Sequence, residues 1–404
     1  MKTKHLVCVS VVTGLFLALA ILPQTLQAED VIKVGVIADL DFPAGKAIRN
    51  AVEMAAEEIN ASGGIMGRQV ELVIADTKLN HDMGAYEYTR LAGQEKVAAV
   101  LGTWASEMAL EILEHVPKYK VPYLTGSAAP EIAEKIKQNY DSLKYVFRMY
   151  FNSYEMADFS SEWLIDEMVK KRGLKRFAMM VEEAKWAHPI AAKWKKELKN
   201  AGAEVAVTEY FDKNTKDYKP IFSRIIEAEC EMTCVLTAFV DAAAFLPQWT
   251  ESKATLMGGI IGSFPNSFRD LGDNAVSIVS LSWPGIFPVK EKDRTFLGKY
   301  SERYKLAPDY NATNVYDALY MLKSAVERAK SVEADAIVEA MEKTDYEGVM
   351  GRWVFDKTSH HSKFGPGFRN FIMMQWQENG KACIIWPEDV KTCEMILPPW
   401  YKKK

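Results

Sequence analysis

The sequence lacks the short motifs with which many enzymes hold phosphate, zinc, a dinucleotide or a nucleophilic serine. None of the patterns GxxxxGK[ST], HExxH, GxGxxG and GxSxG occurs in its 404 residues. The six histidines show no metal-ligand spacing, and the adjacent pair His360 and His361 is expected in a solvated loop. Asp39 and Asp41 alternate along an extended segment and would point to opposite faces. We therefore expect neither catalysis nor a cofactor.

An excess of charge of one sign is also missing. The chain has 50 Lys and Arg against 54 Asp and Glu, with a formal net charge of −4 and both signs interspersed. This balance excludes a basic stripe for nucleic acid and a polybasic membrane patch. We therefore expect small molecules or other proteins as partners.

Long apolar runs are absent except at the start of the chain. A short positive region precedes an apolar stretch from Leu6 to Leu22, and Ala28 offers a small residue at a cut before Glu29. We interpret residues 1–28 as a cleaved signal peptide. The alternative is an uncleaved anchor, because the stretch approaches the ~20 residues that span a bilayer. Cys8 lacks the small-residue context of a lipid-attachment site, so a soluble periplasmic product without stable membrane insertion is expected.

Cysteines are few, and four of the five follow the signal peptide. Export to an oxidising compartment permits disulfides. Cys383 and Cys393 flank a predicted turn and are expected to form a bridge. Cys230 and Cys234 lie where a helix ends and a strand begins, and a second local bridge is expected there. The alternatives for that pair are buried free thiols and, less favoured, a metal site.

What the sequence does contain is a repeated alternation of strand and helix. Residues 31–76 read as a buried strand, a helix and a second buried strand, which is a parallel βαβ unit. The helix places apolar residues at helical spacing: Ile48, Val52, Ala55, Ala56 and Ile59. Strands are then predicted at 97–101, 121–124 and 145–149, and a second series of the same kind runs from 154 to 261. This pattern predicts two doubly wound α/β units, while helices at 291–304, 313–329 and 334–342 are expected to complete them.

Several motifs resemble the leucine/isoleucine/valine-binding protein family, the type I periplasmic solute-binding proteins of ABC transporters. They are EEINASGGIMGRQVELVIADT, GTWAS, VPYLTGSAAP, YVFRMYFN, and the closing stretch from VFDKTSHH to IIWP. The resemblance implies two Rossmann-like lobes joined by a three-strand hinge, with the ligand in the cleft between them. Lobe 1 would comprise 29–149 and 280–362, and lobe 2 would comprise 150–279 and 363–404.

That resemblance implies a receptor that captures a small organic ligand and delivers it to the permease subunits of an ABC importer. Hinge closure over the ligand would be its mechanism. A sensory module that presents the ligand to a membrane receptor is the alternative, and an extracytoplasmic hydrolase is a third.

The resemblance also places ligand residues in two strand-to-helix loops of lobe 1: Trp104, Ala105 and Ser106, then Gly126, Ser127 and Ala128. Ser106 would offer a hydroxyl to a ligand carboxylate, or would only cap its helix. Ala128 stands where amino-acid-binding members often carry threonine, so Ser127 or Thr125 would have to supply that hydroxyl.

Aromatic residues are the expected walls of the site. Trp186 matches an aromatic that closes over the ligand, although a core position is the alternative. Phe239 or Val240 matches a second such position, and Phe42 is a third candidate.

Residues 260–263 contain no carboxylate where amino-acid receptors hold an ammonium group. We therefore expect an apolar or aromatic ligand with one anionic group. Two alternatives stay open: a quaternary cation in an aromatic box, and an amino acid balanced by Asp241 or Glu182. Asp241 could instead only start its helix.

Overall fold

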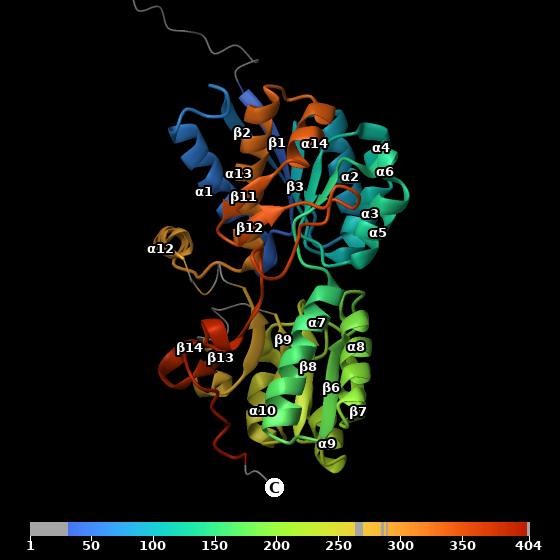
Figure 1. Ribbon diagram of the computed structural model, residues 1–404, viewed down its shortest axis with the longest axis vertical. Helices are drawn as coiled ribbons and strands as arrows, with labels where there is room; N and C mark the ends of the chain where they lie inside the picture. Colours follow the sequence, from blue (N-terminus) through green and yellow to red (C-terminus); the bar gives the residue numbers. More distant parts are fainter. Residues whose placement is uncertain (1–30, 263–269, 284–286, 288–289, 402–404) are drawn as a thin grey trace, which may run out of the picture.

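The protein consists of two lobes, each built on its own β-sheet with helices on both faces (Figure 1). The computed structural model describes residues 31–262, 270–283, 287 and 290–401. The chain leaves the first lobe after β5, returns to it after β10, and enters the second lobe again before β13. The doubly wound two-lobed α/β fold predicted from the sequence is confirmed.

The first lobe has a five-stranded parallel sheet in the order β2-β1-β3-β4-β5. Its strands are β1 (Val31–Ala38), β2 (Gln69–Asp76), β3 (Ala99–Gly102), β4 (Tyr123–Thr125) and β5 (Val146–Arg148). Its helices are α1 (Pro43–Ala61), α2 (His81–Gly93), α3 (Ser106–Leu113), α4 (Val116–Tyr119), α5 (Pro130–Gln138) and α6 (Tyr140–Leu143). The apolar residues of α1 expected to face the sheet are all buried.

The second lobe has a seven-stranded sheet in the order β14-β13-β10-β9-β8-β6-β7. Its strands are β6 (Arg176–Glu182), β7 (Glu204–Phe211), β8 (Met232–Thr237), β9 (Leu256–Ile261), β10 (Val279–Ser282), β13 (Ile372–Gln377) and β14 (Lys381–Trp386). Helices α7 (Ser153–Trp163), α8 (Ala187–Asn200), α9 (Lys219–Glu227) and α10 (Leu246–Ser252) cover it, and a π-helical turn (Leu164–Lys171) extends α7. The β13 strand runs antiparallel to both of its neighbours, β10 and β14, and the other described pairs of this sheet are parallel.

The later helices return to the first lobe, as expected. They are α12 (Glu291–Tyr304), α13 (Tyr310–Ala329) and α14 (Ala334–Met341), followed by the hairpin of β11 (Asp345–Gly348) and β12 (Gly351–Val354). The expected lobe boundary between residues 279 and 280 falls inside β10, which pairs with β9 and β13 in the second sheet. The passage back to the first lobe therefore follows Ser282.

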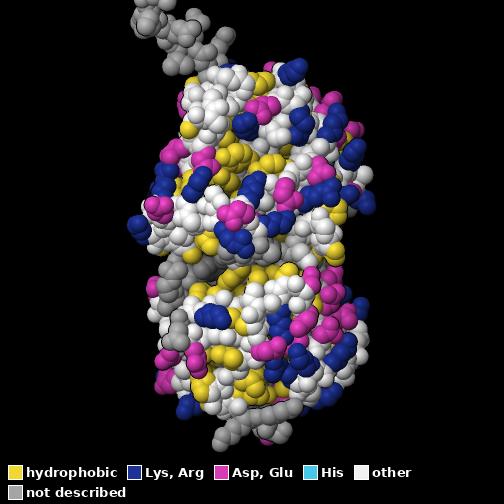
Figure 2. All heavy atoms as spheres, turned by 60° about the vertical axis from the view of Figure 1, so that its left-hand side comes forward, with side chains coloured by type: hydrophobic (Ala, Val, Ile, Leu, Met, Phe, Trp, Pro, Cys, Tyr) yellow, Lys and Arg dark blue, Asp and Glu magenta, His cyan; other side chains and the backbone are white. Residues whose placement is uncertain are grey.

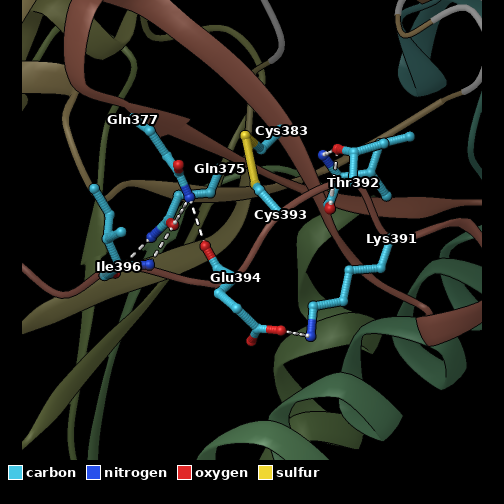
Figure 3. The surroundings of a disulfide bond; sticks show 9 residues. Gln375, Gln377, Cys383, Lys391, Thr392, Cys393, Glu394 and Ile396 are labelled. Carbon is cyan, nitrogen blue, oxygen red and sulfur yellow. Dashed lines mark hydrogen bonds and ion pairs between the residues drawn. A yellow bond between two sulfur atoms is a disulfide. The ribbon is translucent and has the colours of Figure 1, made fainter.

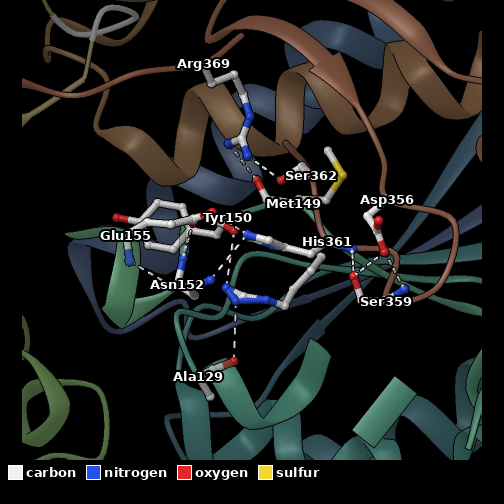
Figure 4. Close-up of polar contacts among 11 residues, drawn as sticks. Ala129, Met149, Tyr150, Asn152, Glu155, Asp356, Ser359, His361, Ser362 and Arg369 are labelled. Atoms are coloured by element: carbon white, nitrogen blue, oxygen red, sulfur yellow. Dashed lines mark hydrogen bonds and ion pairs between the residues drawn. The ribbon is translucent and has the colours of Figure 1, made fainter. Parts of the chain in front are cut away.

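The hinge between the lobes contains a buried polar cluster (Figure 4). Arg148 donates to the backbone oxygens of Ala129 at 3.4 Å and Tyr150 at 3.3 Å. Arg369 donates to the carbonyl of Met149 at 3.3 Å and to the hydroxyl of Ser362. Both guanidinium groups come from crossing segments and both are fully buried, so they tie the crossings to each other.

The prediction that His360 and His361 lie in a solvated loop is wrong. His360 is fully buried, and its ring stacks on Phe147 with centroids 4.2 Å apart. His361 is largely buried, with Nε2 2.7 Å from the carboxylate of Glu155 at the start of α7. The polar composition of this segment suggested exposure, but the segment runs between the lobes and is covered by both.

Cys383 and Cys393 form the predicted disulfide, which pins the C-terminal segment to β14 (Figure 3). Side-chain amides of β13 hold the same segment. Gln375 donates to the carbonyl of Ile396 at 2.8 Å and accepts its N–H at 2.8 Å, while Gln377 donates to the carbonyl of Glu394 at 2.7 Å.

The second predicted disulfide does not form, because Cys230 and Cys234 are buried free thiols. Cys234 belongs to the large core cluster that includes α7 and α8, whereas Cys230 belongs to the cluster around α9 and α10. The two thiols therefore face opposite sides of the sheet. Their proximity in sequence misled the prediction, because only Cys234 belongs to β8. Cys230 precedes the strand in the turn after α9, where its N–H donates to the carbonyl of Ile225 at 3.2 Å, and that turn places its side chain among α9 and α10.

The surface carries Lys, Arg, Asp and Glu side chains intermixed, and Figure 2 shows apolar side chains beside the waist between the two lobes. Within the described part of the chain, no helix combines the length and the apolar character that a membrane crossing requires.

Candidate ligand-binding site

A cavity lies between the lobes where the loops after several parallel strands meet the hinge. The space between its atoms amounts to about 540 Å³, part of it open to solvent. The first lobe contributes Trp104, Ser106, Ala128 and Tyr310. The crossings contribute Tyr150 and Trp283. The second lobe contributes Met156, Trp186, Thr237, Ala238, Phe239, Ile260 and Gly262.

The loop between β3 and α3 brings Trp104 to the cleft. Gly102 has φ 109° and lies so close to β1 that an added Cβ would sit 2.3 Å from the carbonyl oxygen of Ile37, so only glycine fits. The indole N–H of Trp104 donates to the carboxylate of Asp39 at 2.9 Å. Asp39 is buried just after β1 and also accepts the N–H of Leu79 at 3.0 Å. Burial raises the pKa of Asp39, and these hydrogen bonds oppose that rise.

Ser106 presents a hydroxyl to the cavity through a chain of hydrogen bonds. The N–H of Ala129 donates to Ser127 Oγ at 3.2 Å, and Ser127 Oγ donates to Ser106 Oγ at 3.4 Å. Ser106 thus accepts from Ser127. The alternative that Ser106 only caps α3 is wrong, because the N-cap is Ala105 and Ser106 is the first helical residue.

In the second lobe, the turn after β8 places Phe239 at the cavity. The buried carboxylate of Glu182, at the end of β6, accepts the N–H groups of Ala238 at 2.8 Å and Phe239 at 3.1 Å. Burial raises the pKa of Glu182, and these backbone bonds oppose it. Trp186 is the N-cap residue of α8, with 6% of its surface exposed.

The two lobes touch across the cleft. The rings of Trp104 and Phe239 lie with centroids 4.7 Å apart, and the N–H of Lys185 donates to Glu107 at 3.3 Å. The structure is thus a closed arrangement, in which aromatic residues of both lobes meet at the cavity.

Five of the ten predicted ligand residues line the cavity, namely Trp104, Ser106, Ala128, Trp186 and Phe239. The other five do not. Ala105 caps α3 and Ser127 is buried behind Ser106. Gly126 borders a smaller cavity beside α13. Phe42 is the N-cap residue of α1, and exposed Asp241 caps a short 3₁₀ turn by accepting the N–H of Ala243 at 2.9 Å. Val240, the alternative to Phe239, is buried in the core.

No Asp, Glu, Lys, Arg or His side chain is among the described residues that line the cavity. Part of the loop compared with amino-acid receptors, Ser263, lies outside the described residues. The described chain also contains no group of three or more His, Cys, Asp or Glu side chains that could hold a metal ion.

Comparison with known proteins identifies the family. The model of the periplasmic binding protein family matches residues 31–381. The chain belongs to this family. Its members are solute-binding receptors, which agrees with an interlobe cavity and with an extracytoplasmic location.

Relatives of this periplasmic binding protein cover nearly its full length. A Leu/Ile/Val-binding protein homolog 7 from Brucella suis is 24% identical, over 98% of this chain and 99% of its own. A branched-chain amino acid transporter substrate-binding protein from Streptococcus pneumoniae, in complex with isoleucine, has a TM-score of 0.76 at 22% identity, over 87% of this chain and 97% of its own. A solute-binding protein from Rhodopseudomonas palustris, in complex with 3,4-dihydroxybenzoic acid, has a TM-score of 0.77 at 17% identity, over 92% and 99%.

Three aromatic residues of this binding protein's cavity were not predicted from the sequence, namely Tyr150 and Trp283 in the crossings and Tyr310 beside them at the start of α13. Tyr150 and Tyr310 stack with centroids 4.8 Å apart, and Trp283 lies 4.7 Å from Tyr310. Tyr150 stands in the motif YVFRMYFN and could have been found there. Trp283 follows β10 and Tyr310 begins α13, both far from Tyr150 in the sequence. No local pattern marks either of them as a cavity residue.

Proposed function

We propose that this protein is the periplasmic receptor of an ABC importer, exported by cleavage after Ala28, and that its ligand is a small aromatic or apolar carboxylate. The observation that carries the ligand class is the cavity wall, which is aromatic in both lobes and at the hinge and includes no described side chain able to neutralise an ammonium group. A buried ammonium without a counter-ion would be costly.

The hydroxyl of Ser106 is the proposed anchor of the carboxylate. Its oxygen already accepts from Ser127, so its proton is available, and it stands in the first turn of α3 where backbone N–H groups favour an anion. Among the structural neighbours, one holds isoleucine and another 3,4-dihydroxybenzoic acid, so the fold accommodates both ligand types.

Calorimetry on the mature protein tests the ligand class. We expect benzoate and its ring-substituted derivatives to bind in the micromolar range, about −8 kcal/mol, and leucine, isoleucine and valine to bind more weakly. Ser106→Ala should weaken benzoate binding, because it removes the donor and leaves the aromatic walls. Micromolar binding of branched-chain amino acids with no binding of any aromatic carboxylate would reverse the assignment. Loss of uptake of the same compound in cells lacking the receptor would link it to an importer.

A further inference from the structure

Two tryptophans of the cavity wall hold indole N–H groups that have no acceptor. Trp186 and Trp283 expose 6% and 2% of their surfaces, and neither Nε1 has a hydrogen-bond partner in the described protein. Both residues line the cavity, Trp186 from the second lobe and Trp283 from the crossing after β10. A buried donor that lost its water on folding destabilises the protein unless something else accepts it.

Four other buried indoles do have acceptors within the protein. Trp104, Trp194, Trp249 and Trp353 donate at 2.8–3.1 Å to Asp39, Ser160, the carbonyl of Thr255 and Asp317, respectively. Trp163 and Trp400 also lack acceptors, but neither lines the cavity. Among the described residues, only Trp186 and Trp283 both line the cavity and have an indole N–H without an acceptor.

The remaining polar groups of the wall do not meet this need. The described lining includes no Asp, Glu, Asn, Gln or His side chain, and its hydroxyls belong to Ser106, Thr237, Tyr150 and Tyr310. Thr237 donates to the carbonyl of Val240 at 3.2 Å. Neither indole N–H is paired within the described protein, so acceptors brought by a ligand would satisfy them.

We propose that the ligand carries hydrogen-bond acceptors besides its carboxylate, such as hydroxyl, ether or carbonyl oxygens on its ring, and that the N–H groups of Trp186 and Trp283 donate to them. The proposal rests on the proposed function, in which Ser106 of the first lobe takes the carboxylate. The ring oxygens would then be bound by Trp186 of the second lobe and by Trp283 at the hinge.

Isosteric ligand pairs separate a hydrogen bond from shape. Calorimetry would compare 4-methoxybenzoate with 4-ethylbenzoate and 3-methoxybenzoate with 3-ethylbenzoate, using benzoate as the reference. The wild type should favour the ether by about fivefold to tenfold in at least one pair, the effect of one hydrogen bond to an otherwise unpaired buried donor. The preference should disappear in Trp283→Phe or in Trp186→Phe, which keep an aromatic ring and remove the N–H.

Trp104→Phe is the matched control. This variant also loses an indole from the same cavity, but that N–H already donates to Asp39, so the ratio between ether and ethyl ligands should stay as in the wild type. Because each ratio is measured within one protein, a general loss of stability does not mimic the effect.

Three results would overturn the proposal. If benzoate binds and neither pair shows a preference, the ring acceptor is wrong while the proposed function stands. If a Trp→Phe variant weakens benzoate and the ethers by the same factor and the preference for the ether survives in both variants, the indole N–H groups do not donate to a ring oxygen. If no benzoate binds at all, the proposed ligand class fails and this inference fails with it.

Discussion

At the scale of single residues, two buried carboxylates hold the aromatic walls of the cleft, one from each lobe. Asp39 after β1 accepts the indole N–H of Trp104, and Glu182 at the end of β6 accepts the backbone N–H of Phe239. The two aromatic rings meet 4.7 Å apart. Each carboxylate thus positions the aromatic residue through which its lobe closes on the other.

We predict that Trp186→Ala weakens binding of the ligand by more than tenfold. A tryptophan ring contributes on the order of 150 to 250 Å² of contact surface, worth several kcal/mol at ~25 cal/mol/Å². Calorimetry on the ligand found by screening measures the effect, and a thermal melt of the free variant checks that it folds. An unchanged Kd would show that Trp186 belongs only to the core.

We predict that Asp39→Asn lowers ligand affinity several-fold, because an amide offers a single acceptor oxygen to the Trp104 indole and the Leu79 N–H that the carboxylate now serves. Asp41→Asn is the matched control, since Asp41 is exposed two residues further along the chain. Equal affinities of the two variants would show that Asp39 does not position Trp104 for binding.

At the scale of elements, the C-terminal segment after β14 is fastened by one disulfide and by the amides of Gln375 and Gln377. Replacing Cys383 and Cys393 together by Ser should lower the free energy of unfolding by about 2 to 3 kcal/mol, as loop entropy predicts for a ring of this size. Urea denaturation measures the loss.

Non-reducing peptide mapping should find the bridge between Cys383 and Cys393, with Cys230 and Cys234 alkylated only after unfolding. A mapped bridge between Cys230 and Cys234 would contradict the structure.

The strands and helices could largely be predicted from sequence, because buried parallel strands such as β1 and β6 are continuous apolar runs and α1 shows a clear helical period. The packing between these elements could not be predicted from the sequence. Local spacing suggested a bridge between Cys230 and Cys234, but Cys230 lies in the turn before β8 and packs among α9 and α10, whereas Cys234 lies within β8 and packs in the other core cluster. The hinge wall of the cavity was missed for the same reason, since Tyr150, Trp283 and Tyr310 meet only in three dimensions.

At the scale of the whole molecule, the buried cluster at the hinge makes stability depend on pH. Burial lowers the pKa of His361, and the nearby positive charges of Arg148 and Arg369 add to this effect, while Glu155 opposes it. The folded protein therefore binds this proton less readily than the unfolded chain, in which the histidine has its ordinary pKa of about 6.5. As the pH falls through that value, the unfolded state gains the proton first and the free energy of unfolding decreases.

We predict that His361→Gln makes the free energy of unfolding less dependent on pH between pH 7 and 5, because the titrating group is gone. His188→Gln is the control, since exposed His188 pairs with exposed Glu183 and should leave the wild-type slope intact. Urea denaturation across this range measures both slopes. A wild-type slope in the His361 variant would assign the pH dependence to other groups.

The placement of the cysteines has a use of its own. All four between residues 31 and 401 lie in the second lobe, two bridged and two as buried thiols. An added thiol reagent can react with the two free thiols only when the second lobe transiently opens. The labelling rate therefore measures local opening of the second lobe and does not report on the first lobe. Ligand held between both lobes should slow this labelling in proportion to its saturation. The two free cysteines thus act as a native probe for opening of the second lobe.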